Sequence, residues 1–103
     1  MSDRYAQTIS LGDTEIAIVS AVRGGEATLR FADRPGVRPL KIDAGVIDRA
    51  MAADLAARRQ GAPSYVIPLV TENGRLEEAA VAPDRFDALI AAMRAALAYA
   101  EGK

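Results

Sequence analysis

Two glycine-centred turns constrain the fold of this chain most strongly, because each joins two segments with the composition of β-strands. Residues 23–26 read RGGE and residues 72–75 read ENGR. Glycine and the Asn-Gly pair accept the positive φ angles that tight hairpin turns require. A third segment, RPGV at 34–37, places proline and glycine at the central positions of a type II turn. These turns predict two β-hairpins with a further chain reversal between them.

Side-chain alternation identifies the strands beside the turns. Ala27, Leu29 and Phe31 alternate with polar residues, which predicts a strand with one face in water. The segment SYVIPLVT is apolar at both parities, which favours a strand covered on both faces. Its internal Pro68 cannot donate to a neighbouring strand and favours a sheet edge or a bulge, so both interpretations stay open. Shorter strands are expected through Ile9 and Leu11 and through Leu40 and Ile42.

Two helices are expected, one in the middle of the chain and one near its end. The first spans about 44–60, with Asp43 as its N-cap. The second begins at Pro83 or Asp84 and continues to about Glu101. The apolar stripes that should face the core are Ile47, Met51 and Leu55 on the first helix, and Phe86, Ile90, Met93 and Leu97 on the second. Residues 1–103 should therefore form one α+β domain, a small antiparallel sheet of about four to six strands with both helices on one face, in the order β-β-β-(β)-α-β-β-α.

The composition excludes several kinds of chemistry. The chain has no cysteine and no histidine, which rules out disulfides, thiolate nucleophiles, the usual Cys/His zinc sites and imidazole acid–base catalysis. The adjacent Glu77 and Glu78 should point to opposite faces of a strand, and Asp54 with Arg58 has the spacing of an ordinary helical ion pair. No catalytic, metal-binding or cofactor-binding residue is assigned. A small enzyme remains an alternative only if carboxylates from separate elements converge in a pocket.

Charge is unevenly distributed along a chain whose net charge is only −1. Acidic residues dominate 72–87, whereas the segment 23–41 is basic. The basic segment could bind an acidic protein surface, contact nucleic-acid phosphates as an RNA- or DNA-binding regulator, keep a loop solvated, or face the acidic segment within the chain or across a dimer. The candidate contacts for an anionic partner are Arg23, Arg30, Arg34, Arg38 and Lys41.

The first hairpin resembles the central hairpin of the carbon-storage-regulator family, small dimeric translational repressors that bind RNA. The similarity rests on Gly12-Asp13, Ile16, Ile18, Val22-Arg23-Gly24 and Pro35, within a stretch of about a quarter of the chain. The segment LKIDAG before the first helix lacks the arginine that this family uses there to contact RNA. About forty residues after the first helix have no counterpart in the family. The resemblance therefore implies no binding residues for this chain.

The last helix is apolar on nearly every side, which is typical of a helix that is buried by more than one neighbour. Its small residues Ala88, Ala92 and Ala95, with Tyr99, have a spacing that would allow close helix–helix approach. They predict a homodimer that forms through this helix. The chain shows no apolar run of a signal peptide or a membrane span, so a cytoplasmic location is expected. The function that these observations favour is a non-enzymatic binding or regulatory module that acts through protein–protein contacts.

Overall fold

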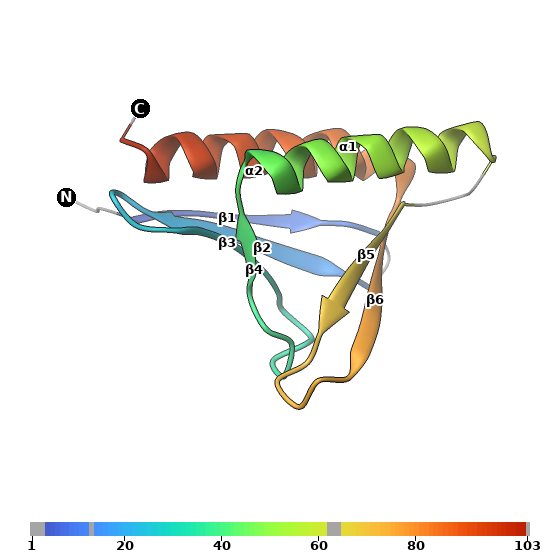
Figure 1. Cartoon of the computed structure of the whole chain (residues 1–103), viewed down its shortest axis with the longest axis horizontal. Helices are drawn as coiled ribbons and strands as arrows, with labels where there is room; N and C mark the ends of the chain where they lie inside the picture. Colours follow the sequence, from blue (N-terminus) through green and yellow to red (C-terminus); the bar gives the residue numbers. More distant parts are fainter. Residues whose placement is uncertain (1–3, 13, 62–64, 103) are drawn as a thin grey trace.

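The computed structural model describes residues 4–12, 14–61 and 65–102 (Figure 1). Within them the chain is an α+β domain in the expected element order. The elements are β1 (Arg4–Ser10), β2 (Ile16–Val22), β3 (Ala27–Phe31), β4 (Leu40–Ile42), α1 (Ala44–Arg59), β5 (Tyr65–Val70), β6 (Leu76–Val81), a 3₁₀ turn (Pro83–Arg85) and α2 (Phe86–Ala100).

The first four strands form an antiparallel sheet in the order β1-β2-β3-β4. The predicted alternation is confirmed on β3, where Ala27, Leu29 and Phe31 are buried and face the helices. On the opposite face Ser20 lies across from Thr28, and their hydroxyl oxygens are 3.2 Å apart. In the described residues no helix covers this outer face, which is open to solvent as Figure 1 shows.

The second hairpin forms a sheet of its own, so the described strands do not form one continuous sheet. β4 is only three residues long, and the chain just before it meets the chain just after β5 through a bridge between Val37 and Thr71. Beyond that bridge the two strands diverge, because β4 leads up into α1 while β5 descends from the other side (Figure 1). Pro68 lies on the edge strand β5, as its missing N–H predicts.

Both helices lie on the same side of the four-stranded sheet and run side by side (Figure 1). The stripe expected on α2 is confirmed, since Phe86, Ile90 and Met93 are buried and Leu97 packs against them. Burial of each such side chain contributes about 1.5–3 kcal/mol to folding. The helical segment begins at Pro83 with one 3₁₀ turn, and the α-helix begins at Phe86.

The stripe expected on α1 is only partly right. Asp43 caps the helix as predicted, accepting a 2.8 Å hydrogen bond from the Val46 N–H. Ile47 is buried, but Met51 is 41% exposed and Leu55 is 51% exposed. The inward side of α1 is formed by Ile47, Ala50 and Asp54 instead, and Met51 and Leu55 lie to one side of it, at the surface beside α2.

Both expected hairpins form, with positive φ angles at Gly24 and Gly74. The second turn differs from the two-residue Asn-Gly turn that the sequence favours, because Asn73 does not have a positive φ and the Gly74 N–H donates to the Thr71 carbonyl at 2.9 Å. The type II prediction for RPGV is wrong. The turn is closed by a 3.1 Å hydrogen bond from the Val37 N–H to the Arg34 carbonyl, but Gly36 does not have the positive φ that a type II turn requires. Neither helix in the described residues is long and apolar enough to cross a membrane.

Candidate interaction surfaces

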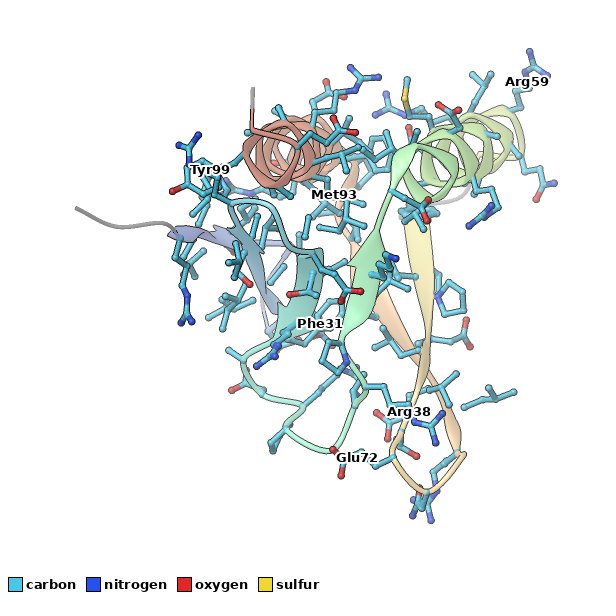
Figure 2. The ribbon with its side chains drawn as sticks, turned by 60° about the vertical axis from the view of Figure 1, so that its left-hand side comes forward. Phe31, Arg38, Arg59, Glu72, Met93 and Tyr99 are labelled. Atoms are coloured by element: carbon cyan, nitrogen blue, oxygen red, sulfur yellow. The ribbon has the colours of Figure 1, made fainter. Side chains whose placement is uncertain are left out.

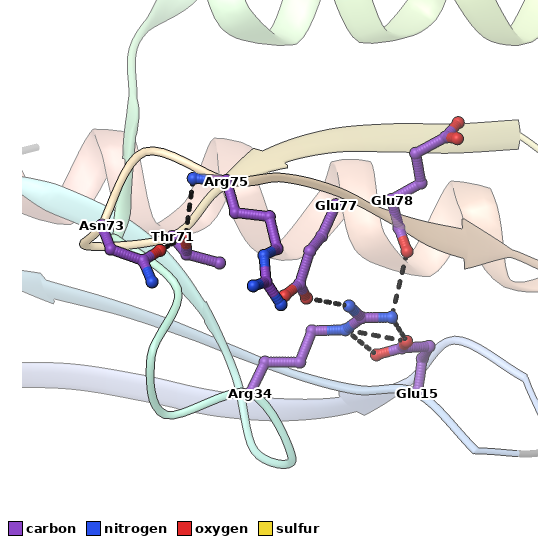
Figure 3. Close-up of polar contacts among 7 residues, drawn as sticks. All are labelled: Glu15, Arg34, Thr71, Asn73, Arg75, Glu77 and Glu78. Atoms are coloured by element: carbon purple, nitrogen blue, oxygen red, sulfur yellow. Dashed lines mark hydrogen bonds and ion pairs between the residues drawn. The ribbon is translucent and has the colours of Figure 1, made fainter.

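Arg34, from the middle of the basic segment, is held inside the chain by contacts to two other parts of the fold (Figure 3). Its Nε and Nη2 donate to Glu15 just before β2, with Nη2 2.5 Å from Oε1. Its Nη1 is 2.6 Å from Oε1 of Glu77 on β6, and Nη2 also donates to the Glu78 carbonyl at 3.0 Å. A guanidinium that binds a carboxylate through two nitrogens is positioned more firmly than a lysine could be.

The hydrogen bonds to Glu15 raise the pKa of the Arg34 guanidinium above its ordinary value, against the opposing effect of burial, and Glu77 adds to the increase. The basic and acidic segments therefore face each other within the chain at this point, one of the arrangements that the charge pattern allowed. Arg34 connects the four-stranded sheet to the β5–β6 hairpin. Its guanidinium is therefore engaged by groups of the same chain.

The other candidate cations lie on separate parts of the surface. Arg23 stacks on the Tyr99 ring, with its guanidinium carbon 4.5 Å from the ring centroid. Arg38 lies at the tip of the domain beside Glu72, whose carbonyl it contacts at 3.2 Å (Figure 2). Lys41 lies on the outer face of the four-stranded sheet, as does Arg30. The basic segment thus forms no single docking strip.

The outer face of the four-stranded sheet is the part of the molecule that could most readily contact an anionic surface. It carries Arg30 and Lys41, although Lys41 lies 3.7 Å from the exposed Glu26. Strand alternation places no aromatic side chain on this face in the described strands, since Tyr5 and Phe31 belong to the inner parity. Proteins that bind single-stranded nucleic acids usually stack bases on such rings.

The predicted dimer surface on α2, which we call the alanine ridge, consists of Ala88, Ala92, Ala95 and Tyr99. These four residues are not all on the surface. Ala88 and Ala95 are exposed, but Ala92 is 2% exposed and belongs to the core. Tyr99 is partly buried, 6.0 Å from the Tyr5 ring. The chain itself covers Ala92, because α2 packs against both the sheet and α1. Only Ala88 and Ala95 of the ridge are therefore accessible to a neighbouring helix.

Carboxylates from separate elements do converge at one place, around Arg34. Glu15 and Glu77 both bind its guanidinium, whose single positive charge offsets one of their two negative charges. Glu78 points to the other face of β6, as the strand alternation predicts. Among the described residues no group of three or more acidic side chains could hold a metal ion.

The outer side of the second hairpin, which we call the hairpin face, carries three of the exposed large apolar side chains in the described residues. Leu76 is 78% exposed there, and Val66 and Val70 are each about 40% exposed. The sequence signal for this surface is the apolar character of SYVIPLVT at both parities, which favours a strand covered on both faces. One of those faces is uncovered in the single chain. The hairpin face consists of Val66, Pro68, Val70, Leu76, Glu78 and Ala80.

A second exposed apolar surface lies on the side of α1 that borders α2, and we call it the α1 patch. It consists of Met51, Leu55 and Arg59, spaced one helical turn apart. Arg59 projects outward from the end of the helix (Figure 2). Arg94 on α2 adds a second cation beside it, with Nη2 3.1 Å from the Met51 sulfur. The α1 patch is therefore apolar with a basic border, whereas the hairpin face is apolar with an acidic residue, Glu78.

Comparison with known proteins gave no match, since no family model, curated protein or solved structure is similar to this chain.

Proposed function

We propose that this protein is a non-enzymatic binding module that works through protein–protein contacts, and that its first partner is a second copy of itself. The observation that carries this proposal is the uncovered hairpin face. An isolated two-stranded sheet is marginally stable in water, so it gains most when both of its faces are covered. Here the inner face packs on the core through Ile67, Leu69, Ala79 and Val81, while the outer face is largely apolar and meets only solvent.

Two hairpin faces alone leave little margin for association. Full burial of one Val or Leu side chain contributes about 1.5–3 kcal/mol, but Val66 and Val70 are already more than half buried in the single chain, and association costs about 4–15 kcal/mol in lost translational and rotational freedom. A symmetric dimer uses every contact twice, so two such faces and two further apolar patches can exceed this cost. The α1 patch supplies the second pair of surfaces on the same chain.

Charge complementarity favours a second copy over an unrelated partner. Glu78 lies within the hairpin face, and Arg59 and Arg94 border the α1 patch. In a twofold dimer that packs the hairpin face of each chain on the α1 patch of the other, each acidic residue meets a basic border. A dimer built from two hairpin faces alone would instead bring the two Glu78 carboxylates together.

The test is the molar mass in solution, measured by light scattering after size-exclusion chromatography at several protein concentrations. Wild-type protein should have twice the 10.9 kDa mass of the chain, and Leu76→Glu should have the mass of a single chain. Leu55→Glu should also dissociate the dimer, because it changes the other half of the same contact. Val22→Glu is the matched control, since Val22 is 45% exposed on the other sheet and should leave the mass unchanged.

Two results would contradict the proposal. A monomeric wild-type protein at all concentrations would remove the self-association. A dimer that survives Leu76→Glu but is dissociated by Ala95→Glu would place the contact on the exposed part of the α2 ridge instead.

A further inference from the structure

A groove opens where β4 and β5 diverge. Of the residues that form the hairpin face, Val66 and Pro68 line it. Its volume is about 270 Å³, and its floor is made by the buried side chains of Leu29, Leu89 and Met93. Leu40 and Val46 line the side of the four-stranded sheet and α1. The only charged residue that lines the groove is Arg49, which makes no ion pair with any described residue.

The register of the sheets determines which backbone groups point into this groove. On β5 the hairpin closes with a 2.8 Å bond from the Thr71 N–H to the Arg75 carbonyl, so the residues at 65, 67 and 69 bond to β6. The backbone groups of Val66 and Pro68 therefore point away from β6, toward β4. Pro68 offers only its carbonyl, and the carbonyl of Val70 on the same edge already accepts a 2.9 Å bond from the Arg38 N–H.

The same reasoning applies to β4 on the other side. The Val22 N–H bonds to the Glu26 carbonyl at 3.2 Å, so alternate residues of β3 starting at Ala27 direct their backbone groups to β4. Ala27 and Leu29 lie opposite Ile42 and Leu40, which leaves the N–H and carbonyl of Lys41 pointing toward the groove. Within the described residues, neither Lys41 nor Val66 has a strand partner on that side.

We infer that this groove binds an extended peptide segment of a partner protein, which adds a strand at the edge of β5 or β4. The unpaired edge groups of Val66, Pro68 and Lys41 provide the backbone hydrogen bonds, and the apolar floor receives every second side chain of the peptide. Arg49 at the rim selects a segment with an acidic residue. The inference rests on the proposed function and names a class of partner. The peptide would use the backbone edge of Val66 and Pro68, whereas the dimer contact uses the outward side chains of the hairpin face and the α1 patch.

The probe is a phage-displayed library of random linear heptapeptides, selected against the full-length protein. Selected sequences should alternate apolar and polar residues and contain an aspartate or glutamate. Synthetic versions should shift the amide resonances of Lys41 and Val66 in ¹⁵N-correlated spectra. Copies with alternate backbone nitrogens methylated should bind at least tenfold more weakly, because they lose the donors that strand addition needs.

Three variants of α1 make the test specific. Ala53→Trp places an indole ring at the mouth of the groove and should weaken the selected peptides at least tenfold. Ala56→Trp adds the same ring to an exposed position of the same helix outside the groove lining, and should leave the affinity unchanged. Arg49→Glu should weaken acidic peptides severalfold and favour versions in which lysine replaces the acidic residue.

Three results would overturn the inference: a library that yields no sequence above background, selected peptides that bind Ala53→Trp as tightly as wild type, or resonance shifts that lie on the hairpin face around Leu76. The outcome is separable from that of the proposed function. Leu76→Glu should remove the dimer while the selected peptides still bind, and Ala53→Trp should remove peptide binding while the dimer persists.

Discussion

Replacement of Arg34 by methionine should destabilise the protein by about 2–3 kcal/mol. The magnitude follows from the burial of the three charged side chains. Arg34 is 24% exposed, Glu15 15% and Glu77 32%, so the cluster lies between a surface ion pair and a buried one. Surface pairs contribute about 0–1 kcal/mol, whereas loss of one partner of a buried pair costs about 3–5 kcal/mol because a charge is left without compensation.

The assay is urea unfolding followed by circular dichroism. A chain of this size should have an m-value of about 1–2 kcal/mol/M, so the midpoint should fall by roughly 1–3 M urea. Arg34→Lys should recover only part of the loss, because an ammonium group cannot bind Glu15 through two nitrogens in the same plane. A double-mutant cycle of Arg34→Met with Glu15→Gln should give a coupling free energy of at least about 1 kcal/mol.

Arg30→Met is the matched control, because Arg30 lies exposed on the outer face of the sheet and no ion pair holds it within the described residues. Its effect should stay within about 0.5 kcal/mol of wild type. If Arg34→Met falls within that same range, the two sheets do not depend on this cluster, and the interpretation of Arg34 as a structural residue is wrong. Arg34 would then be available to an outside partner.

The remaining predictions concern the core, alkaline pH and nucleic acids. Met93→Ala should cost about 2–5 kcal/mol in the same urea assay, since Met93 is buried between α2, α1 and the sheets. Burial, with a smaller contribution from the Asp54 carboxylate, raises the pKa of Tyr65 above its ordinary value of 10.0. The folded state then holds the phenolic proton more tightly than the unfolded state, so stability should fall as pH rises above about 10, and Tyr65→Phe should reduce that fall. Single-stranded RNA should show no retardation in gel shifts even at about 50 mM salt, and strong retardation there would assign the outer face of the four-stranded sheet to nucleic-acid binding.

The fold is predictable because local signals agree with each other. The glycine turns at 23–26 and 72–75, the alternation of β3 and the cap at Asp43 all indicate structure within a few residues of themselves. The type II prediction at 34–37 is wrong because Pro-Gly fits more than one turn type, and the tertiary contacts of Arg34 and Val37 decide which one forms.

The interaction surfaces are harder to predict, because they depend on where elements end in space. Met51 and Leu55 continue the apolar stripe of Ile47, but the side of α1 that packs inward is that of Ile47, Ala50 and Asp54. The apolar character of 65–70 is clear, but whether another layer of the same chain covers its second face is a property of the packing. The prediction for α2 places Ala92 on an outer surface, yet this residue is buried because its side of α2 packs on the four-stranded sheet.

The division of the strands into two sheets depends on a similar long-range effect. Six strands could pair as one sheet, yet β4 stops after Ile42 because the Asp43 cap starts α1 immediately. β5 therefore has no partner on that side, and the groove results. The sequence indicates a short strand that ends at the Asp43 cap. It does not indicate that β5 will lack a strand partner on that side as a result.

Cysteine labelling measures directly whether a partner covers the hairpin face in solution. The chain has no cysteine, so Ala80→Cys and, as a control, Thr28→Cys each create a single reactive site. As the protein concentration rises, the rate at which maleimide modifies the Ala80→Cys variant should fall at least tenfold, while the rate for Thr28→Cys, on the outer face of the four-stranded sheet, stays constant. If neither rate depends on protein concentration, the hairpin face remains in water, and that result would contradict the account.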